Sequence, residues 1–359
     1  MDAAAAGAIT KPSVSTGWLR APAFDLSFIV GTTALALGTT AFLLNHPALF
    51  APVFILNMWL LGFHHVVATF TRICFDRQSL RQYWPLVTVL PPVLFAVVCA
   101  IGFGPGQWLL ATIYFYWQAF HYARQSYGIS MAYARRPENA PNVDLRLNRW
   151  MLYSVPLWGV LQRSHDAPEK FLGLEVWFLP VPLLAVQAAA LVALLLVTWW
   201  CIDLLRGIRR GALPLSHALY GFSHIVVFAA GYLLVGPLDL GWLLINIWHN
   251  AQYLLFVWHF NNKRFADRVD PERPFLSNLS RRENVPAYLL VCLAISTVGY
   301  AAVLQLSAAV HLEQVTLVFL VAQTLNYHHY IVDGIVWRSG AVAAAMRTAQ
   351  APPATQAAA

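Results

Sequence analysis

LEQVTLVFLVAQTLNYHHYIVDGIVWR, residues 312–338, begins as an apolar stretch and ends in a dense group of polar side chains. Its first half has the composition of a membrane interior, whereas residues 326–338 contain two adjacent histidines, an asparagine, an aspartate and two tyrosines. An α-helix needs about 20 predominantly apolar residues to cross the hydrocarbon core of a bilayer. The stretch therefore predicts a membrane-spanning helix whose last turns carry polar, chemically reactive side chains.

The composition of the whole chain agrees with this class. Of the 359 residues, 59% are hydrophobic and 11% are charged, and the mean hydropathy is +0.57. Soluble domains carry about 25% charged residues, so the composition argues against a water-soluble globule. The four cysteines lie in separate apolar segments without a CxxC pair, which argues against a disulfide framework or a thiolate metal site.

Apolar segments of spanning length recur along the chain. We expect an all-α, polytopic integral membrane helix bundle with about ten transmembrane helices. Their predicted ranges are 24–44, 51–73, 83–103, 107–130, 147–162, 176–204, 213–235, 239–261, 285–309 and 313–337. We expect residues 1–23 to form a cytoplasmic N-terminal arm, residues 24–338 a single transmembrane domain, and residues 339–359 a disordered cytoplasmic tail.

The cationic residues favour one orientation of this bundle. With the N-terminus placed in the cytoplasm, all but two of the 23 lysines and arginines fall on the cytoplasmic side, the exceptions being Arg163 and Lys170. The positive-inside rule therefore favours ten spans with both termini cytoplasmic. We interpret the formal net charge of +7 as a topology signal. The chain is then expected to be a multi-pass protein of a bacterial inner (cytoplasmic) membrane, with the lipid bilayer and not nucleic acid as its partner.

Histidines concentrate at one depth of the predicted bundle. Of the twelve histidines, His46, His165 and His311 fall in or beside outside loops, and the other nine fall in the cytoplasmic halves of five spans. His259 is interpreted as interfacial, and the remaining eight are candidate metal ligands: His64, His65, His121, His217, His224, His249, His328 and His329. Each one taken singly is readily explained as a hydrogen-bonded packing residue. Because polar groups in a bilayer are costly and tend to be functional, their common depth predicts a buried metal or cofactor site.

Other polar side chains share helix faces with these histidines. Residues three, four and seven positions apart stack on one side of a helix, so Asp333 could ligate a metal beside His329 or hold a histidine tautomer. We assign candidate catalytic roles to Asp333, Tyr253 and Arg124. The candidates for cofactor binding and proton relay are Asn246, Asn250, Gln118, Gln125 and Asn326.

The side-chain inventory favours a redox metal. Neutral imidazole suits iron, copper, zinc and nickel, whereas magnesium and calcium prefer oxygen ligands, and carboxylates are scarce in the histidine band. One zinc ion takes three or four protein ligands, and one bis-histidine haem takes two. A pair of iron or copper ions accounts best for the number of histidines.

The doubled histidines, His64–His65 and His328–His329, occur on the predicted cytoplasmic side. In this they resemble the sites of the histidine-rich membrane di-iron class, which includes fatty-acid desaturases, hydroxylases and alkane monooxygenases. The resemblance covers about four segments and is one of site composition, because the chain has no HxxxH or HxxHH box and more spans than that class. It implies an oxygen-activating enzyme with two iron ions.

Our leading hypothesis is a membrane-embedded, metal-dependent oxidoreductase that activates O₂ at a histidine-ligated dinuclear iron or copper centre. A site near acyl-chain depth suggests an apolar, lipid-like or isoprenoid substrate. Electrons would come from a cytoplasmic donor, for which the basic loop 262–282 is a possible docking surface. Two alternatives stay open: a haem-binding electron-transfer protein, with ligands such as His224 and His249, and a proton-coupled transporter with a histidine relay. The sequence shows no internal repeat of the kind that many transporters have, which argues against the transporter.

Overall fold

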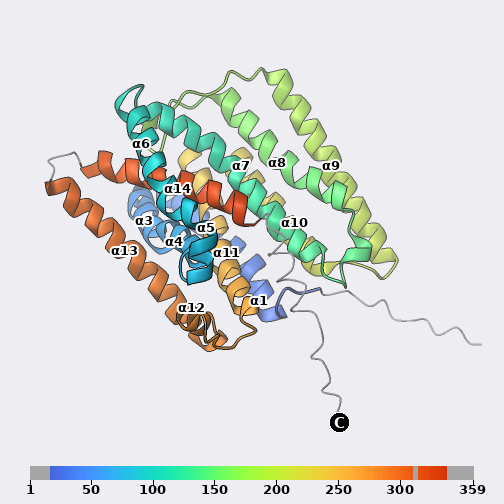
Figure 1. The fold of residues 1–359 in the computed structure, drawn as a ribbon. Coiled ribbons are helices and arrows are strands. Elements are labelled where there is room, and N and C mark those ends of the chain that lie inside the picture. The colour runs from blue at the N-terminus through green and yellow to red at the C-terminus, as the bar shows by residue number, and fades with distance from the viewer. Residues whose placement is uncertain (1–16, 310–313, 338–359) are drawn as a thin grey trace, which may run out of the picture. The chain divides into compact units, whose positions relative to one another are not determined.

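The computed structural model describes residues 17–309 and 314–337, and this part of the chain is almost entirely helical (Figure 1). The α-helices are α1 (Pro22–Leu26), α2 (Thr32–Asn45), α3 (Phe50–Asn57), α4 (Phe63–Ile73), α5 (Arg77–Thr88), α6 (Leu90–Phe103), α7 (Gln107–Ala134), α8 (Leu145–Asp166), α9 (Leu183–Arg209), α10 (Leu215–Ala229), α11 (Leu238–Arg264), α12 (Pro274–Leu279), α13 (Val285–Ala309) and α14 (Gln314–Val336). The π-helical turns are η1 (Ser27–Gly31), η3 (Met58–Gly62) and η5 (Ala230–Leu234), and the 3₁₀ turns are η2 (Pro47–Leu49), η4 (Ala140–Asn142) and η6 (Arg282–Asn284). A short antiparallel hairpin pairs β1 (Lys170–Phe171) with β2 (Leu174–Glu175).

Each predicted span coincides with a helical segment of the structure. Six of these segments are long and apolar enough to cross a membrane: Pro22–Asn45, Pro47–Ile73, Arg77–Phe103, Leu183–Arg209, Leu215–Leu234 and Arg282–Ala309. The other four predicted spans fall on α7, α8, α11 and α14. These helices carry many polar residues, such as Asn246, His249, Asn250 and Gln252 in α11. The helical membrane fold class is confirmed, while the count of ten spans and the orientation stay predictions.

The start of the sixth predicted span is wrong. The sequence predicts a helix from residue 176, whereas α9 begins at Leu183. Residues 176–182 contain Pro180 and Pro182 and are not helical, because proline has no N–H to donate and clashes with a preceding helical turn. Four features of the sequence prediction lie outside the described residues: positions 1–16 of the arm, the tail at 339–359, His311 and Arg338.

The chain forms two compact units. The first consists of Met1–Ala41, Ala119–Pro168 and Phe178–Ile245, and the second of Phe42–Gln118, Glu169–Trp177 and Asn246–Ala359. In the first unit, α8 packs against α9 and α10. In the second unit, α13 packs against α4 and α14, and α6 packs against α14 (Figure 1). Helices α2, α7 and α11 contribute residues to both units.

A contact between two glycines brings backbones together within the first unit. A Cβ atom built on Gly241, near the start of α11, would lie 1.9 Å from the carbonyl oxygen of Gly231 in η5. No other residue type fits at this separation without moving the backbone. Small residues allow such close helix contacts in membranes, where van der Waals packing drives helix association.

The second predicted span contains a π-helical turn in front of its doubled histidines. The turns and helices η2, α3, η3 and α4 follow one another without a break from Pro47 to Ile73, and η3 ends one residue before the start of Phe63–Ile73. A π-helical turn holds one more residue than an α-helical turn and is common at functional sites. The turn therefore sets the direction in which the histidines of α4 point.

Candidate metal centre

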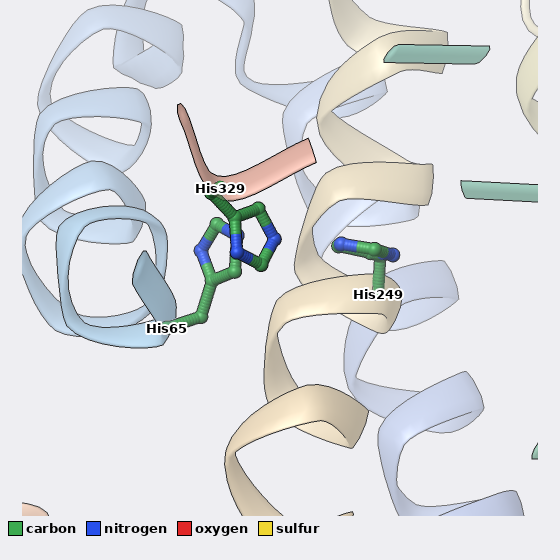
Figure 2. A group of neighbouring side chains, drawn as sticks. All are labelled: His65, His249 and His329. Carbon is green, nitrogen blue, oxygen red and sulfur yellow. The ribbon is translucent and has the colours of Figure 1, made fainter. Parts of the chain in front are cut away.

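Three buried histidines of the second unit converge from three helices. His65 lies on α4, His249 on α11 and His329 on α14, and ligand nitrogens of the three rings all lie within 4.8 Å of one another (Figure 2). The ring centroid of His65 lies 4.7 Å from that of His329 and 5.6 Å from that of His249. None of the three is more than 5% exposed. Each doubled histidine pair contributes one member, because consecutive residues point about 100° apart around an α-helix.

The backbone of η3 fixes the ring of His65. Its Nδ1–H donates to the carbonyl oxygen of Gly62 at 2.5 Å, and the Nδ1–H of His64 donates to the carbonyl oxygen of Leu60 at 3.0 Å. A π-helical turn departs from the regular α-helical ladder, and here the histidine side chains bond to its carbonyl groups. With Nδ1 used as the donor, neutral His65 carries its lone pair on Nε2, the form in which imidazole binds a metal.

A chain of hydrogen bonds fixes the ring of His329. The hydroxyl of Tyr253 donates to Oδ1 of Asp333 at 2.6 Å. The hydroxyl of Thr69 lies 2.9 Å from the Tyr253 oxygen and 2.8 Å from Nδ1 of His329. These four side chains, all at most 7% exposed, are referred to below as the Thr69 relay.

The direction of the Thr69 relay follows from counting protons. Tyr253 has one hydroxyl proton and gives it to Asp333, so Thr69 must donate in its bond to Tyr253. Thr69 then has no proton left for His329, so Nδ1–H of His329 must donate to Thr69. Neutral His329 therefore carries its lone pair on Nε2. That atom lies 3.7 Å from Oδ2 of Asp333, which puts a carboxylate oxygen beside the cluster.

An asparagine cluster lies beside His249. Oδ1 of Asn246 accepts hydrogen bonds from Nδ2 of Asn57 at 2.8 Å and from Nδ2 of Asn250 at 2.9 Å. All three amides are at most 6% exposed. Asn246 and Asn250 flank His249 on α11, so the hydrogen bonds to Asn57 hold this part of α11 against the segment that carries His65. Such side-chain bonds stabilise the contact of helices inside membranes.

The geometry of the three rings fits a metal ion. Two nitrogen ligands bound to one ion at about 2.1 Å each lie at most about 4.2 Å apart. Nitrogens within 4.8 Å of one another therefore reach ligating positions by side-chain movements of under about 1 Å. The rings of His65 and His329 are both fixed through Nδ1 and carry their lone pair on Nε2. Hydrogen bonds of this kind to the far ring nitrogen are the usual support of a metal-bound histidine.

The surroundings of the cluster are apolar. Ala68, Leu254 and Val257 pack around Tyr253 on one side, joined by Leu61 and Leu289. Ile73, Val332 and Val336 form a second buried group at the junction of α4 and α14. Both groups exclude water from the helices that carry the cluster, which strengthens electrostatic interactions within it.

The other candidates in the second unit lie beside the cluster or further along its helices. His328 points toward α5, with its ring stacked on Phe70 at 5.3 Å and its Nε2–H donating to the carbonyl oxygen of Leu86 at 2.6 Å. Within the described residues, Nε2 of His64 and Nδ1 of His328 have no hydrogen-bond partner. Gln118 donates to the hydroxyl of Tyr114 at 2.7 Å, and Asn326 is half-buried on α14.

The remaining candidates belong to the first unit: His121, Arg124, Gln125, His217 and His224. His224 has both ring nitrogens in hydrogen bonds, Nδ1 with the hydroxyl of Ser126 at 2.7 Å and Nε2 with the carbonyl oxygen of Leu152 at 2.8 Å. Nε2 of His217 lies 3.0 Å from Oδ1 of Asn148. His121 is buried on α7, and Arg124 and Gln125 are half-buried one turn later.

Sequence reasoning missed Thr69, Asn57 and Arg72. Thr69 follows His65 by four residues and therefore shares its helix face, a signal that could have been found. Asn57 gives no such signal, because the π-helical turn after it changes the helical phase. Arg72 was interpreted as a cytoplasmic flanking charge, yet it is only 8% exposed.

Comparison of the chain with known proteins identifies no relative. Protein-family models, curated proteins and solved structures were each compared with it, and none of them matches. The geometry of the histidine cluster and its hydrogen bonds is therefore the basis for assigning a function.

Proposed function

We propose that this chain is a membrane-embedded, metal-dependent oxidoreductase with His65, His249 and His329 as ligands of its metal. The observation that carries the proposal is the convergence of three buried imidazoles from three helices. Imidazole suits iron, copper and zinc, and a redox reaction requires iron or copper. When bound, such a metal would supply O₂ activation and one-electron chemistry.

The chain's own residues would orient the ligands and handle a proton. His65 and His329 are held with Nε2 available by Gly62 and Thr69. Asp333 accepts a hydrogen bond from the hydroxyl of Tyr253, and its Oδ2 lies 3.7 Å from Nε2 of His329, close enough to serve as a further ligand. The Thr69 relay also offers a route by which a proton could pass between Asp333 and the edge of the cluster.

The geometry of the second unit most directly supports one ion per chain. A dinuclear iron or copper centre, which the number of histidines suggests, would require further ligands. His64 and His328 are the candidates on the same helices, because each has a ring nitrogen without a hydrogen-bond partner among the described residues. We therefore propose a first ion at the three-histidine cluster and treat a second as a separate question for metal analysis.

We also propose an orientation in the membrane and a class of substrate. The distribution of lysine and arginine supports ten spans, with both termini and the cluster toward the cytoplasm. The apolar surroundings support a lipid-like or isoprenoid substrate, and the basic loop 262–282 could receive a cytoplasmic electron donor. An apolar cavity of about 440 Å³ lies between α4, α13 and α14. Its α4 wall, which includes Phe63, Val67 and Phe70, faces about opposite to His65 around the helix, so we do not assign the reacting position to it.

Metal analysis of the purified full-length chain tests the proposal. We expect at least one iron or copper per chain and no Soret band in the absorption spectrum. A Soret band would replace the proposal with a haem protein, and zinc alone would exclude redox chemistry at the cluster. A metal-free preparation that retains activity would exclude the metal centre altogether.

Histidine variants locate the metal. We expect His65→Ala, His249→Ala and His329→Ala each to lose most of the bound metal, because three ligands from three helices act together. The matched control is His165→Ala, since His165 is exposed and belongs to the first unit. Partial loss of metal in His64→Ala and His328→Ala, with one ion retained, would support a second ion. Equal metal in all five variants and the control would refute the assigned site.

A further inference from the structure

We propose that Arg72 binds the oxyanion headgroup of an apolar amphiphile at one end of α4. The site would consist of the Arg72 guanidinium and the two aromatic rings next to it, Phe260 and Trp337. Binding of the amphiphile at Arg72 does not require the metal. The further claim that this amphiphile is the substrate rests on the proposed function, because it would be the molecule that the metal centre oxidises.

Arg72 is a buried cation that has no polar side-chain partner in the described part of the chain. Its side chain is 8% exposed, and its Nε and Nη1 atoms have no hydrogen-bond partner among the described residues. The guanidinium carbon lies 3.7 Å from the ring centroid of Phe260 and 4.6 Å from that of Trp337. Ring contacts satisfy the charge only in part, because they leave the N–H donors unused.

The carboxylates near Arg72 are committed elsewhere. Asp76 pairs with Arg264 at 3.3 Å and with Arg273 at 3.6 Å. Asp333 accepts from Tyr253 and acts on Arg72 only at longer range. No ion pair involving Arg72 is found within the part of the chain that the structure describes.

The chemistry of the unused donors selects an oxyanion. A guanidinium presents N–H groups in a fixed planar fork that matches the two oxygens of a carboxylate or phosphate. A buried charge is stabilised when such a partner supplies both the opposite charge and the hydrogen-bond acceptors. The two adjacent aromatic rings pack against the guanidinium and hold the fork in place, so that a bound oxyanion would meet a fixed partner.

The position of Arg72 favours an amphiphile over a free anion. Arg72 lies at the end of the segment Pro47–Ile73, where an apolar helix meets the charged corner at Asp76 and Arg77. Tryptophans such as Trp337 are enriched at this level of a bilayer, and guanidinium groups there attract lipid headgroups. A headgroup bound at Arg72 would leave its chain in the apolar layer.

Arg72 also shares a helix face with the metal cluster. His65, Thr69 and Arg72 are spaced by four and three residues, so they stack on one side of α4. Seven residues separate His65 from Arg72, a rise of about 10 Å along the helix. An amphiphile held at Arg72 could thus bring a position partway along its chain to the cluster, while the headgroup stays outside it.

The test is a binding experiment on the full chain in micelles of a nonionic maltoside detergent, which carries no oxyanion, after metal removal with a chelator. The probe is dodecanoate labelled with ¹³C at the carboxyl group, observed by its carboxyl resonance. We expect saturable binding to the wild type, at least a tenfold loss of affinity in Arg72→Gln, and a smaller loss in Arg72→Lys, which keeps the charge without the fork. The matched control is Arg149→Gln, because Arg149 also approaches a tryptophan, at 5.8 Å, but is exposed.

Each arm of this experiment decides one part of the proposal. Unchanged dodecanoate affinity in both Arg72 variants would overturn the site. If Arg72→Gln does not fold, as judged by circular dichroism and size exclusion, the Arg72→Lys result decides. Dodecanol that competes as well as the acid would overturn the oxyanion assignment, and inorganic phosphate or acetate that competes as well as dodecanoate would overturn the amphiphile. Because metal is absent throughout, failure here is distinguishable from failure of the metal centre.

Discussion

The hydroxyl oxygen of Tyr253 lies 2.6 Å from Oδ1 of Asp333, and this bond determines which ring nitrogen of His329 carries the proton. The influence passes through Thr69, which bonds to both Tyr253 and His329. One carboxylate acceptor thereby sets the donor direction of two further bonds. Nε2 of His329 thereby carries the lone pair, which is the form of imidazole that the proposed metal would require.

Replacing Tyr253 with phenylalanine tests this relationship. Without the tyrosine hydroxyl, Thr69 is free to donate to Nδ1 of His329, which favours the tautomer with its proton on Nε2. We expect the metal affinity to fall by about 10–100-fold, the range for loss of a bond that supports a ligand. The measurement is metal retained against a competing chelator. The control is Tyr327→Phe, which removes a buried hydroxyl that donates to the carbonyl oxygen of Leu110 at 2.8 Å; an equal loss in both variants would contradict the relay.

A threonine series separates the hydroxyl from the methyl group. We expect Thr69→Val to lower the metal affinity by about 10–100-fold and Thr69→Ser to restore most of it, because serine keeps the relay hydroxyl. The same chelator competition measures both. Thr88→Val serves as the control, since the Thr88 hydroxyl bonds only to the carbonyl oxygen of Trp84 on its own helix. A serine variant that behaves like valine would show that packing, not proton direction, is involved.

His224 is expected to act through stability. Both of its ring nitrogens are in hydrogen bonds with buried partners, Ser126 and Leu152. Removing the ring in His224→Ala leaves the carbonyl oxygen of Leu152 without its side-chain donor, which costs about 1–3 kcal/mol in free energy of unfolding. Ser126 loses one partner but keeps its contact with the Tyr220 hydroxyl at 3.1 Å. Unfolding in a detergent titration measures the loss, and metal analysis of the folded fraction should give the wild-type content. Loss of metal from well-folded His224→Ala would instead support its role as a ligand.

The carboxylate of Asp76, between α4 and α5, is expected to make the protein less stable in acid. Burial by itself raises the pKa of Asp76. Hydrogen bonds from the backbone N–H and hydroxyl of Ser79, together with the charges of Arg264 and Arg273, outweigh burial and hold the pKa below the ordinary value of an aspartate. A carboxyl whose pKa is lowered by folding stabilises the protein above its unfolded pKa, and this contribution is lost as the pH falls through the folded value. The free energy of unfolding of wild type should therefore approach that of Asp76→Ala only in strong acid.

Asp144 provides the comparison for Asp76 at neutral pH. Both residues cap helices, Asp76 at α5 and Asp144 at α8, and loss of a cap costs about 1 kcal/mol. Asp76→Ala also leaves Arg264 without its carboxylate and removes one of the two that Arg273 contacts, so we expect it to destabilise more than Asp144→Ala. Equal effects on unfolding in detergent at pH 7 would mean that the ion pairs add nothing.

The contact between Gly231 and Gly241 predicts a steric requirement. A methyl group on Gly241 would overlap the carbonyl oxygen of Gly231 at 1.9 Å, and overpacking typically costs about 1–3 kcal/mol. We expect Gly241→Ala to lower the free energy of unfolding by at least this amount. Gly38→Ala is the matched control, because a Cβ there meets nothing within 4 Å and alanine favours the helix. Equal stability of the two variants would refute the close approach.

Much of the helical layout was predictable, whereas the cluster was predictable only in part. Apolar length locates six helical segments that could cross a membrane, because in lipid a spanning segment must satisfy its own backbone bonds. Composition and depth place eight histidines in one band, but depth does not say which way a side chain faces. For His65 the facing depends on the π-helical turn at Met58–Gly62, which leaves no mark in a hydropathy pattern. For His329 it depends on Thr69 and Tyr253, residues brought together from 184 positions apart.

The π-helical turn η3 decides how the polar row on α4 is aimed. A regular α-helix that gained one residue would rotate everything after it by about 100°, whereas a π-helical turn takes up the extra residue and leaves the following turns facing as before. In α4 the face aimed in this way carries His65, Thr69 and Arg72 together. If residues 58–62 wound as a regular α-helix, the same row would turn by about 100° and lose its partners on α11 and α14. The extra residue of η3 therefore acts as a spacer that sets the aim of a whole helix without changing any residue of the row.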